Sequence, residues 1–219
     1  MHKALNCFRS FAYKAGKNHT RTVWVLKCDI RKFFANIDHT MLKNILAKHI
    51  QNANVLRLLD EIINSFYTPL HSNGVGNSEK GLPLGNLTSQ LLVNVYMNEF
   101  DQFVKHKLKV KRYIRYADDF VVMSEKKGEL EILLPKVRIF LEQNLKLSLH
   151  PEKVFIKTLS SGIDFLGWVH FPDHRVLRTA TKRRMLKRVQ THPANETIQS
   201  YLGLLQHGNA RKLKEKMLR

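Results

Sequence analysis

Two adjacent carboxylates, Asp118 and Asp119, lie between two short runs of strand-forming residues, "RYIRYA" and "FVVMS". A third carboxylate, Asp29, comes near the end of the apolar run "VWVLKCDI". Side chains alternate between the faces of a strand, so the paired acids converge only if the chain bends between them, as at a hairpin tip. Three carboxylates brought together repel one another unless a cation lies among them. Hard oxygen ligands favour magnesium, with manganese as a substitute, and such sites carry out phosphoryl transfer with two metal ions.

The structural alternative is a polar turn at Asp118 and Asp119 and a capped strand end at Asp29. An Asp-Asp dipeptide taken alone favours this alternative, because acidic residues are common in turns. The order of the segments around the three acids therefore has to decide between the two interpretations.

The composition favours a nucleic-acid partner. The 219 residues include 37 Lys and Arg against 18 Asp and Glu, giving a formal net charge of +19. This positive field attracts nucleic acid or an anionic membrane surface, and a hydrophobic content of 43% indicates a folded chain. No apolar stretch approaches the roughly 20 residues that span a bilayer, and the amino terminus lacks an apolar signal segment, so we expect a cytoplasmic protein that binds no membrane. Cys7 and Cys28 lack metal-ligand spacing, and we expect neither disulfide nor structural zinc.

The elements expected to position the acids alternate between helices and strands. Periodicity and turn residues predict, in order, a buried strand over 23–30, helices over 39–50 and 53–66, a loop over 67–86, a long and mostly buried helix over 87–105, a hairpin over 112–124, a helix over 127–143, strands over 148–157 and 163–171, and basic helices from about residue 180. This order predicts an α+β fold, an antiparallel sheet packed on helices, with a helical appendage.

Five segments in order resemble the motifs of reverse transcriptases. "LKCDIRKFFANIDH" resembles the first catalytic motif, "GLPLGNLTSQLLVNVYMNEFD" the second, "YADD" the third, "LHPEKVFI" the fourth and "FLGW" the primer grip. The resemblance implies RNA-directed DNA polymerase activity on a palm with a ferredoxin-like core, followed by a short basic thumb. It also implies template RNA, a primer or cDNA, and deoxynucleoside triphosphates as partners.

Within bacterial and phage reverse transcriptases, "LPLGNLTSQ" is most similar to the enzymes of diversity-generating retroelements. Leu84 stands where group II intron and retron enzymes have Gln, and Ser89-Gln90 stands where they have Ser-Pro. A Leu84 beside the nascent base pair would weaken geometric checking, whereas core packing is the alternative role. This subfamily also implies a small basic helical accessory protein.

The resemblance assigns roles to individual residues. Asp29, Asp118 and Asp119 would hold the metals, with the Ile30 carbonyl as a further ligand. Lys153 would protonate the leaving pyrophosphate or neutralise its charge, and a solvated surface lysine is the alternative.

Nucleotide-binding roles fall on Phe34, Leu84, Gly85 and Tyr116. Phe34 would exclude a 2′-hydroxyl, or be a core aromatic, and Gly85 would let the backbone approach the nucleotide. The primer grip would be a turn formed by Phe165, Leu166, Gly167 and Trp168 that holds the primer end near the metals. The residues that would contact phosphates, unless they form only a solvated face, are Lys182, Arg183, Arg184, Lys187 and Arg188.

The resemblance also implies a domain division: residues 1–22 as a truncated remnant of the fingers, 23–175 as the palm with fingers-side helices over 38–85, and 176–219 as the start of the thumb. Three alternatives remain: a noncatalytic RNA-binding palm fragment, a group II intron- or retron-like enzyme, and a nucleotidyl cyclase. The "YADD" turn does not fit the Gly-Gly-acidic-acidic turn of cyclases.

Overall fold

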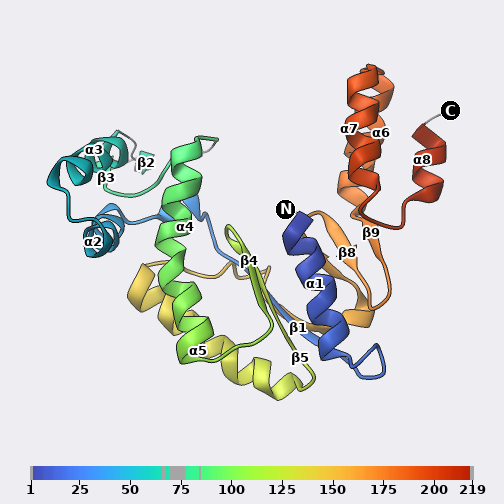
Figure 1. Cartoon of the computed structure of the whole chain (residues 1–219), viewed down its shortest axis with the longest axis horizontal. Coiled ribbons are helices and arrows are strands. Elements are labelled where there is room, and N and C mark those ends of the chain that lie inside the picture. The colour runs from blue at the N-terminus through green and yellow to red at the C-terminus, as the bar shows by residue number, and fades with distance from the viewer. Residues whose placement is uncertain (1, 66–67, 70–76, 84, 218–219) are drawn as a thin grey trace. The chain divides into compact units, whose positions relative to one another are not determined.

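The structure is a computed structural model that describes residues 2–65, 68–69, 77–83 and 85–217 (Figure 1). The chain forms two compact units. Unit 1 comprises Met1–Val25, Met123–Leu130 and Ile156–Arg219, and unit 2 comprises Leu26–Val122 and Glu131–Phe155. No helix within the described ranges is long and apolar enough to cross a membrane.

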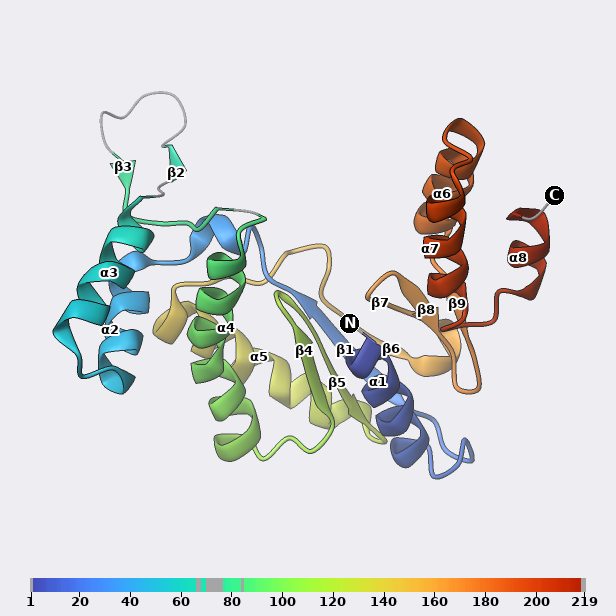
Figure 2. The ribbon, with the colours of Figure 1, turned by 45° about the horizontal axis from the view of Figure 1, so that its top comes forward.

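A four-stranded sheet has the order β4-β5-β1-β6. Its strands are β1 (Trp24–Asp29), β4 (Tyr113–Tyr116), β5 (Asp119–Ser124) and β6 (Phe155–Thr158). Helix α4 (Leu87–Gln102) precedes β4 in the chain, and α5 (Lys127–Leu145) follows β5 (Figure 2). With the helices before α4 set aside, the chain order is β-α-β-β-α-β, and the outer strands flank β1 and β5 as in ferredoxin-like folds. The predicted α+β fold is confirmed.

Aromatic side chains pack the core of unit 2 between α4 and the hairpin. Phe100 of α4 is fully buried, and its ring centroid lies 5.1 Å from that of Phe120 and 6.0 Å from that of Tyr113. Phe103 stacks on Phe140 of α5 at 4.1 Å. These contacts fix the helices against the strands that carry the paired acids.

Helix α4 is less buried than its apolar composition suggests. Asn86 caps its first turn by accepting a hydrogen bond from the Thr88 amide, and the α-helix gives way to a π-helix over Phe103–Lys107. Leu87 and Leu91 are 80% and 65% exposed, so the expectation of a mostly buried helix is wrong for its first turns. The physical reason is that only one side of α4 is packed against the core.

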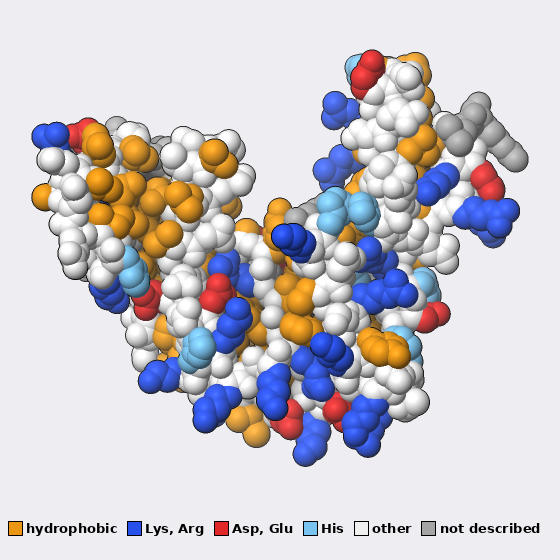
Figure 3. Space-filling model, viewed as in Figure 1, with side chains coloured by type: hydrophobic (Ala, Val, Ile, Leu, Met, Phe, Trp, Pro, Cys, Tyr) orange, Lys and Arg blue, Asp and Glu red, His pale blue; other side chains and the backbone are white. Residues whose placement is uncertain are grey.

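Helices α2 (His39–His49) and α3 (Ala53–Asn64) confirm the predicted pair. Asp38 caps α2 and Asn52 caps α3, each accepting backbone amide hydrogen bonds. Two short strands, β2 (Thr68–Pro69) and β3 (Asn77–Ser78), pair within the segment expected to be a loop. Val55, Leu58 and Ile62 of α3 stay partly exposed, and Figure 3 shows hydrophobic side chains gathered over this part of unit 2.

In unit 1, β7 (Ile163–Phe165), β8 (Trp168–His170) and β9 (Arg175–Leu177) form an antiparallel sheet. The single strand that the pattern over 163–171 predicts is wrong, whereas the turn that the resemblance implies at Phe165–Trp168 is present. Leu166 and Gly167 both have positive φ values, 53° and 81°, and turn the chain between β7 and β8. The strand expected over 148–157 is also too long, since β6 begins only at Phe155.

Two elements of unit 1 were not predicted, β9 and the amino-terminal helix α1 (His2–Ala15). The buried face of α1 includes Leu5 and Phe8, and Phe8 stacks on Phe165 with ring centroids 5.6 Å apart. Helices α6 (Thr179–Thr191), α7 (Asn195–Leu205) and α8 (Arg211–Met217) confirm the predicted basic helical segment. A single apolar cluster joins these elements through Leu5, Trp168, Leu177, Met185, Leu205, Ala210, Leu213 and Met217.

Candidate active site

Backbone hydrogen bonds hold the end of β1 between two other segments. The Ile30 amide donates to the carbonyl of Asp118 (3.3 Å), which ties β1 to the turn between β4 and β5. On the other side, the His150 amide donates to the carbonyl of Asp29 (2.8 Å). The main chain therefore brings the end of β1, which carries Asp29, against the turn that carries Asp118.

The paired acids lie at a two-residue hairpin. Tyr116 pairs with Asp119, so Ala117 and Asp118 form the turn, and Ala117 has a φ of 55°. Asp118 is not among the residues with positive φ, so only the first of the two central residues is left-handed. The Asn-Gly and Asp-Gly signatures belong to turns in which both central residues have positive φ, so this turn lacks them. The Arg115 guanidinium donates to the Ala117 carbonyl (Nη1 to O, 3.1 Å) and so supports the turn.

A mostly buried ion pair supports the hairpin from α4. Arg115 binds Asp101 in bidentate fashion, with Nε to Oδ1 at 2.9 Å and Nη2 to Oδ2 at 2.7 Å. The Tyr113 hydroxyl also donates to Asp101 (2.7 Å). Burial lowers the pKa of Arg115, but the hydrogen bond and charge of Asp101 outweigh it and raise the pKa overall. Sequence reasoning missed this pair, because nothing in the spacing of Asp101 and Arg115 shows that α4 lies against β4.

The carboxylates share one electrostatic neighbourhood. Burial raises the pKa of Asp119 to about 6; the charge and hydrogen bond of Lys27 oppose this rise, and the charges of Asp29 and Asp118 add to it. Burial also raises the pKa of Asp118, with a further contribution from the charge of Asp29. The site thus has the mutual repulsion expected of three converging acids.

Two lysines offset this repulsion. Lys27 Nζ lies 2.9 Å from Asp119 Oδ1, and the Lys27 side chain is only 10% exposed. Lys153 Nζ lies 3.5 Å from Asp29 Oδ2, with its side chain 56% exposed. Sequence reasoning selected Lys153 and missed Lys27. The signal for Lys27 was its position two residues before Asp29, which puts both side chains on one face of β1.

The donor chemistry of the three acids fits a divalent cation. Carboxylate oxygens are the ligands that magnesium and manganese prefer, and a bound cation would relieve the repulsion between the acids. Within the described residues, however, no three His, Cys, Asp or Glu side chains are placed so that they could hold a metal ion together. Metal ligation by these residues, and by the Ile30 carbonyl, stays a prediction.

The residues predicted to bind the nucleotide come from several segments. Phe34 begins a short 3-10 helix (Phe34–Asn36), and its carbonyl accepts a hydrogen bond from the Leu82 amide (2.9 Å), which brings the second motif beside the first. Gly85 has a φ of 87°, with open space where a Cβ would stand. Tyr116 is 44% exposed. Leu84 lies outside the described residues.

The primer-grip and phosphate-contact residues belong to unit 1, whereas the three acids belong to unit 2. Phe165 and Trp168 are buried at 0% and 1% exposure and face each other across the Leu166-Gly167 turn. In α6 the five predicted phosphate-contact residues are all exposed, whereas Met185 of the same helix is buried: Lys182, Arg183, Arg184, Lys187 and Arg188.

A family model described as reverse transcriptase (RNA-dependent DNA polymerase) matches residues 1–170. The chain belongs to this family. The resemblance drawn from the motifs is thereby confirmed, and the family match excludes the nucleotidyl cyclase alternative.

Two bacterial relatives are both longer than this reverse transcriptase chain. It is 27% identical to Protein YkfC of Escherichia coli over 206 residues, covering 80% of this chain and 52% of YkfC. It is 24% identical to the group II intron-encoded protein LtrA of Lactococcus lactis over 243 residues, covering 83% of this chain and 39% of LtrA. The chain thus spans about half the length of YkfC or less than half that of LtrA.

A solved structure shares the fold. Telomerase from Candida albicans, determined in complex with a fragment of telomeric RNA, superposes with a TM-score of 0.63 at 9% identity, covering 93% of this chain and 41% of the telomerase. At this identity the likeness shows the fold alone, and it agrees with the α+β palm.

Proposed function

We propose that this chain carries out RNA-templated DNA synthesis by nucleotidyl transfer, at the site where the end of β1 meets the β4–β5 turn. The observation that carries the proposal is that the charges of Asp29 and Asp118 act on Asp119 while the Ile30 amide, next to Asp29, donates a hydrogen bond to the Asp118 carbonyl. The family match supports the reaction class.

Asp29, Asp118 and Asp119 would hold two magnesium ions, or manganese in their place, with the Ile30 carbonyl as a further ligand. Bound there, such ions supply the Lewis-acid chemistry of in-line phosphoryl displacement. Lys27 keeps the Asp119 carboxylate in place through its 2.9 Å contact. Lys153, exposed beside Asp29, is free to turn toward a leaving pyrophosphate and donate a proton or neutralise its charge.

The chain's other residues would position the substrates. The half-buried ring of Phe34 would select a deoxynucleotide by excluding the 2′-hydroxyl, while Tyr116 and Gly85 would contact the nucleotide. The Phe165–Trp168 turn would hold the primer end. The exposed cations of α6 would contact phosphates of template RNA and primer without reading sequence.

The subfamily proposal is an enzyme of a diversity-generating retroelement. It rests on Leu84 and on Ser89-Gln90 in the second motif, and it brings with it a small basic helical accessory protein as a partner. Ser89 is buried in α4, and its hydroxyl has no hydrogen-bond partner among the described residues. A group II intron-like enzyme is the second candidate, favoured by the similarity to LtrA.

Primer extension on an RNA template tests the proposal. The assay supplies magnesium, or manganese in a parallel series, with four deoxynucleoside triphosphates at low salt. We expect Asp118→Asn to reduce extension by on the order of 10²–10³, as for loss of one main transition-state interaction. Glu142→Gln removes one charge from the exposed surface of α5 and should leave extension unchanged.

Failure of the parent chain to extend would contradict the catalytic proposal for this chain. If parent and Asp118→Asn then bound RNA with equal affinity that falls steeply with salt, the noncatalytic RNA-binding alternative would take its place. The extension products also test the subfamily, because Leu84→Gln should lower misincorporation if Leu84 lies beside the nascent pair.

A further inference from the structure

A charged cavity lies within unit 1, and none of its lining residues is among those of the proposed polymerase site, although Trp168 of the proposed primer grip packs against two of them, Arg175 and Gly208. It has a volume of about 340 Å³ and is lined by α1, the hairpin between β8 and β9, and the segment that follows α7. The residues that decide its chemistry are Arg9, Asp173, His174, Arg175 and His207.

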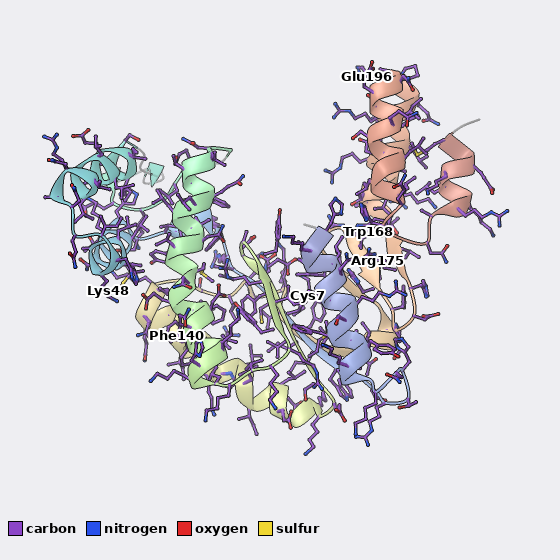
Figure 4. The ribbon with its side chains drawn as sticks, in the orientation of Figure 1. Cys7, Lys48, Phe140, Trp168, Arg175 and Glu196 are labelled. Atoms are coloured by element: carbon purple, nitrogen blue, oxygen red, sulfur yellow. The ribbon has the colours of Figure 1, made fainter. Side chains whose placement is uncertain are left out.

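Arg175 offers an unused donor to this cavity. Its Nε donates to the carbonyl of His207, and its guanidinium carbon lies 5.7 Å from the centre of the Trp168 ring (Figure 4). Its Nη1 atom is buried, yet it has no hydrogen-bond partner among the described residues. A charged donor left without an acceptor away from water costs free energy, so this edge of the guanidinium is suited to an anion.

The charges around Arg175 also favour the binding of an anion. Burial lowers the pKa of Arg175, and the positive charge of Arg9 lowers it further, so the two arginines repel each other. His207 stacks on His2 with ring centroids 3.8 Å apart. Asp173 is the acidic residue among those that line the cavity. Its side chain is 78% exposed and its Oδ1 lies 2.8 Å from Nδ1 of His174, so it does not neutralise the two arginines.

One wall of the cavity is fixed by close packing. Gly208 lies so near the Trp168 ring that a Cβ atom would overlap with it. Trp168 itself is 1% exposed and belongs to the apolar cluster of unit 1. Arg175 is therefore held against a rigid ring, which orders its guanidinium before any ligand arrives and lowers the entropy cost of binding.

We propose that this cavity binds a phosphate group, which accepts hydrogen bonds from Arg175 and Arg9. A tetrahedral oxyanion matches the forked donors of a guanidinium and would relieve the repulsion between the two arginines. The phosphate comes from a nucleic-acid strand or from free pyrophosphate, because both present the same oxygens. The site adds a second point of phosphate contact to the proposed polymerase and does not depend on the three acids.

Binding of inorganic pyrophosphate to the whole chain tests the site directly. Titration calorimetry without divalent metal, at ionic strength held constant with chloride, should detect binding that weakens about tenfold in Arg9→Gln, the loss of one charge-assisted hydrogen bond. Arg9 is exposed, and its side chain makes no hydrogen bond or ion pair among the described residues, so this variant should fold. Arg211→Gln removes the same charge from a side chain that is 90% exposed in α8, and should bind as the parent does.

A second arm identifies the source of the phosphate. A fluorescent single-stranded oligonucleotide is titrated at the same ionic strength into the parent, Arg9→Gln, Arg175→Lys and the control Arg211→Gln. If the phosphate belongs to a strand, both variants weaken oligonucleotide binding, and pyrophosphate competes for the parent. If only pyrophosphate binding weakens, the site takes the free ion. Equal binding by parent, Arg9→Gln and Arg211→Gln in both arms, or no binding above the chloride control, would overturn the proposal.

Discussion

Two hairpins of this chain use the same short connection and differ in what supports it. The turn between β4 and β5 has Ala117 and Asp118 at its centre, and the turn between β7 and β8 has Leu166 and Gly167. The first rests on the Arg115–Asp101 ion pair, and the second lies between the buried rings of Phe165 and Trp168. A turn that displays carboxylates is thus anchored by charge, whereas the turn proposed to hold the primer end is anchored by apolar packing.

The same contrast extends to the buried titratable group of each hairpin. Burial raises the pKa of Asp119 in β5 to about 6 and lowers the pKa of His170 in β8 to about 4. Both shifts disfavour the charged form, as expected on transfer from water to the protein interior. Asp119 has Lys27 and a place in the proposed metal site to compensate for its charge, whereas His170 stays neutral, with its Nε2 near the carbonyl of Phe165.

The largest predicted effect concerns the ion pair under the first hairpin. Arg115→Met leaves the Asp101 carboxylate without its partner and should lower the free energy of unfolding by roughly 3–5 kcal/mol. Urea denaturation measures the loss, and amide hydrogen exchange should quicken in β4 and β5 more than in β7 and β8. Arg21→Met breaks an exposed pair with Glu125 and is the control, with an expected cost of less than about 1 kcal/mol. Equal losses of unfolding free energy in the two variants would show that the buried Arg115–Asp101 pair stabilises the fold no more than the exposed pair does.

The next prediction concerns pH and the second hairpin. The folded-state pKa of His170 is about 4, below its ordinary 6.5. Between these two pH values the unfolded chain binds a proton at His170 and the folded chain does not. The stability from neutral His170 is present above pH 6.5 and is lost as pH falls toward 4, by on the order of 3 kcal/mol. His170→Gln should flatten this part of the stability curve, measured by urea denaturation at each pH. An unchanged slope in the variant would mean that other groups cause the acid loss.

Asp119 should behave in the opposite sense. Its folded-state pKa is raised from 3.8 to about 6, so in the metal-free protein its ionisation lowers stability as pH rises through this window. Asp119→Asn is therefore the matched comparison for His170→Gln, because removal of each group should change the pH slope with opposite sign.

The smallest effect is expected from exchanging the turn residues. Gly167 has a φ of 81°, and Gly167→Ala should lower the free energy of unfolding by about 1–2 kcal/mol, the cost of a left-handed residue with a Cβ. Ala117→Gly removes that strain from the first hairpin but adds freedom to the unfolded chain, so it should raise stability by less than about 1 kcal/mol. Thermal unfolding compares the two. A loss in both variants would indicate that the Ala117 methyl group makes a favourable contact.

Much of the fold follows from local patterns. The helices over 39–50 and 53–66 were predicted closely, because Asp38 and Asn52 are strong capping residues ahead of periodic apolar positions. The errors arose where local chemistry was ambiguous. "IDFLGWVHF" has the composition of one strand, and only the positive φ values of Leu166 and Gly167 divide it. Helix α1 was missed although its buried residues, Leu5, Phe8, Ala12 and Ala15, recur at helical spacing, because residues 1–22 were interpreted as a remnant of the fingers.

Residue types and their spacing were enough to assign the family and to predict a hairpin turn at the paired acids, which the structure places at Ala117 and Asp118. The surroundings of the acids follow from the packing of the whole chain. Lys27 reaches Asp119, Arg115 reaches Asp101, and Arg175 meets the segment after α7, each across a long stretch of chain. Such partners are chosen by the packing of whole elements, which no local pattern records, and they set the charge balance on which both proposed sites depend.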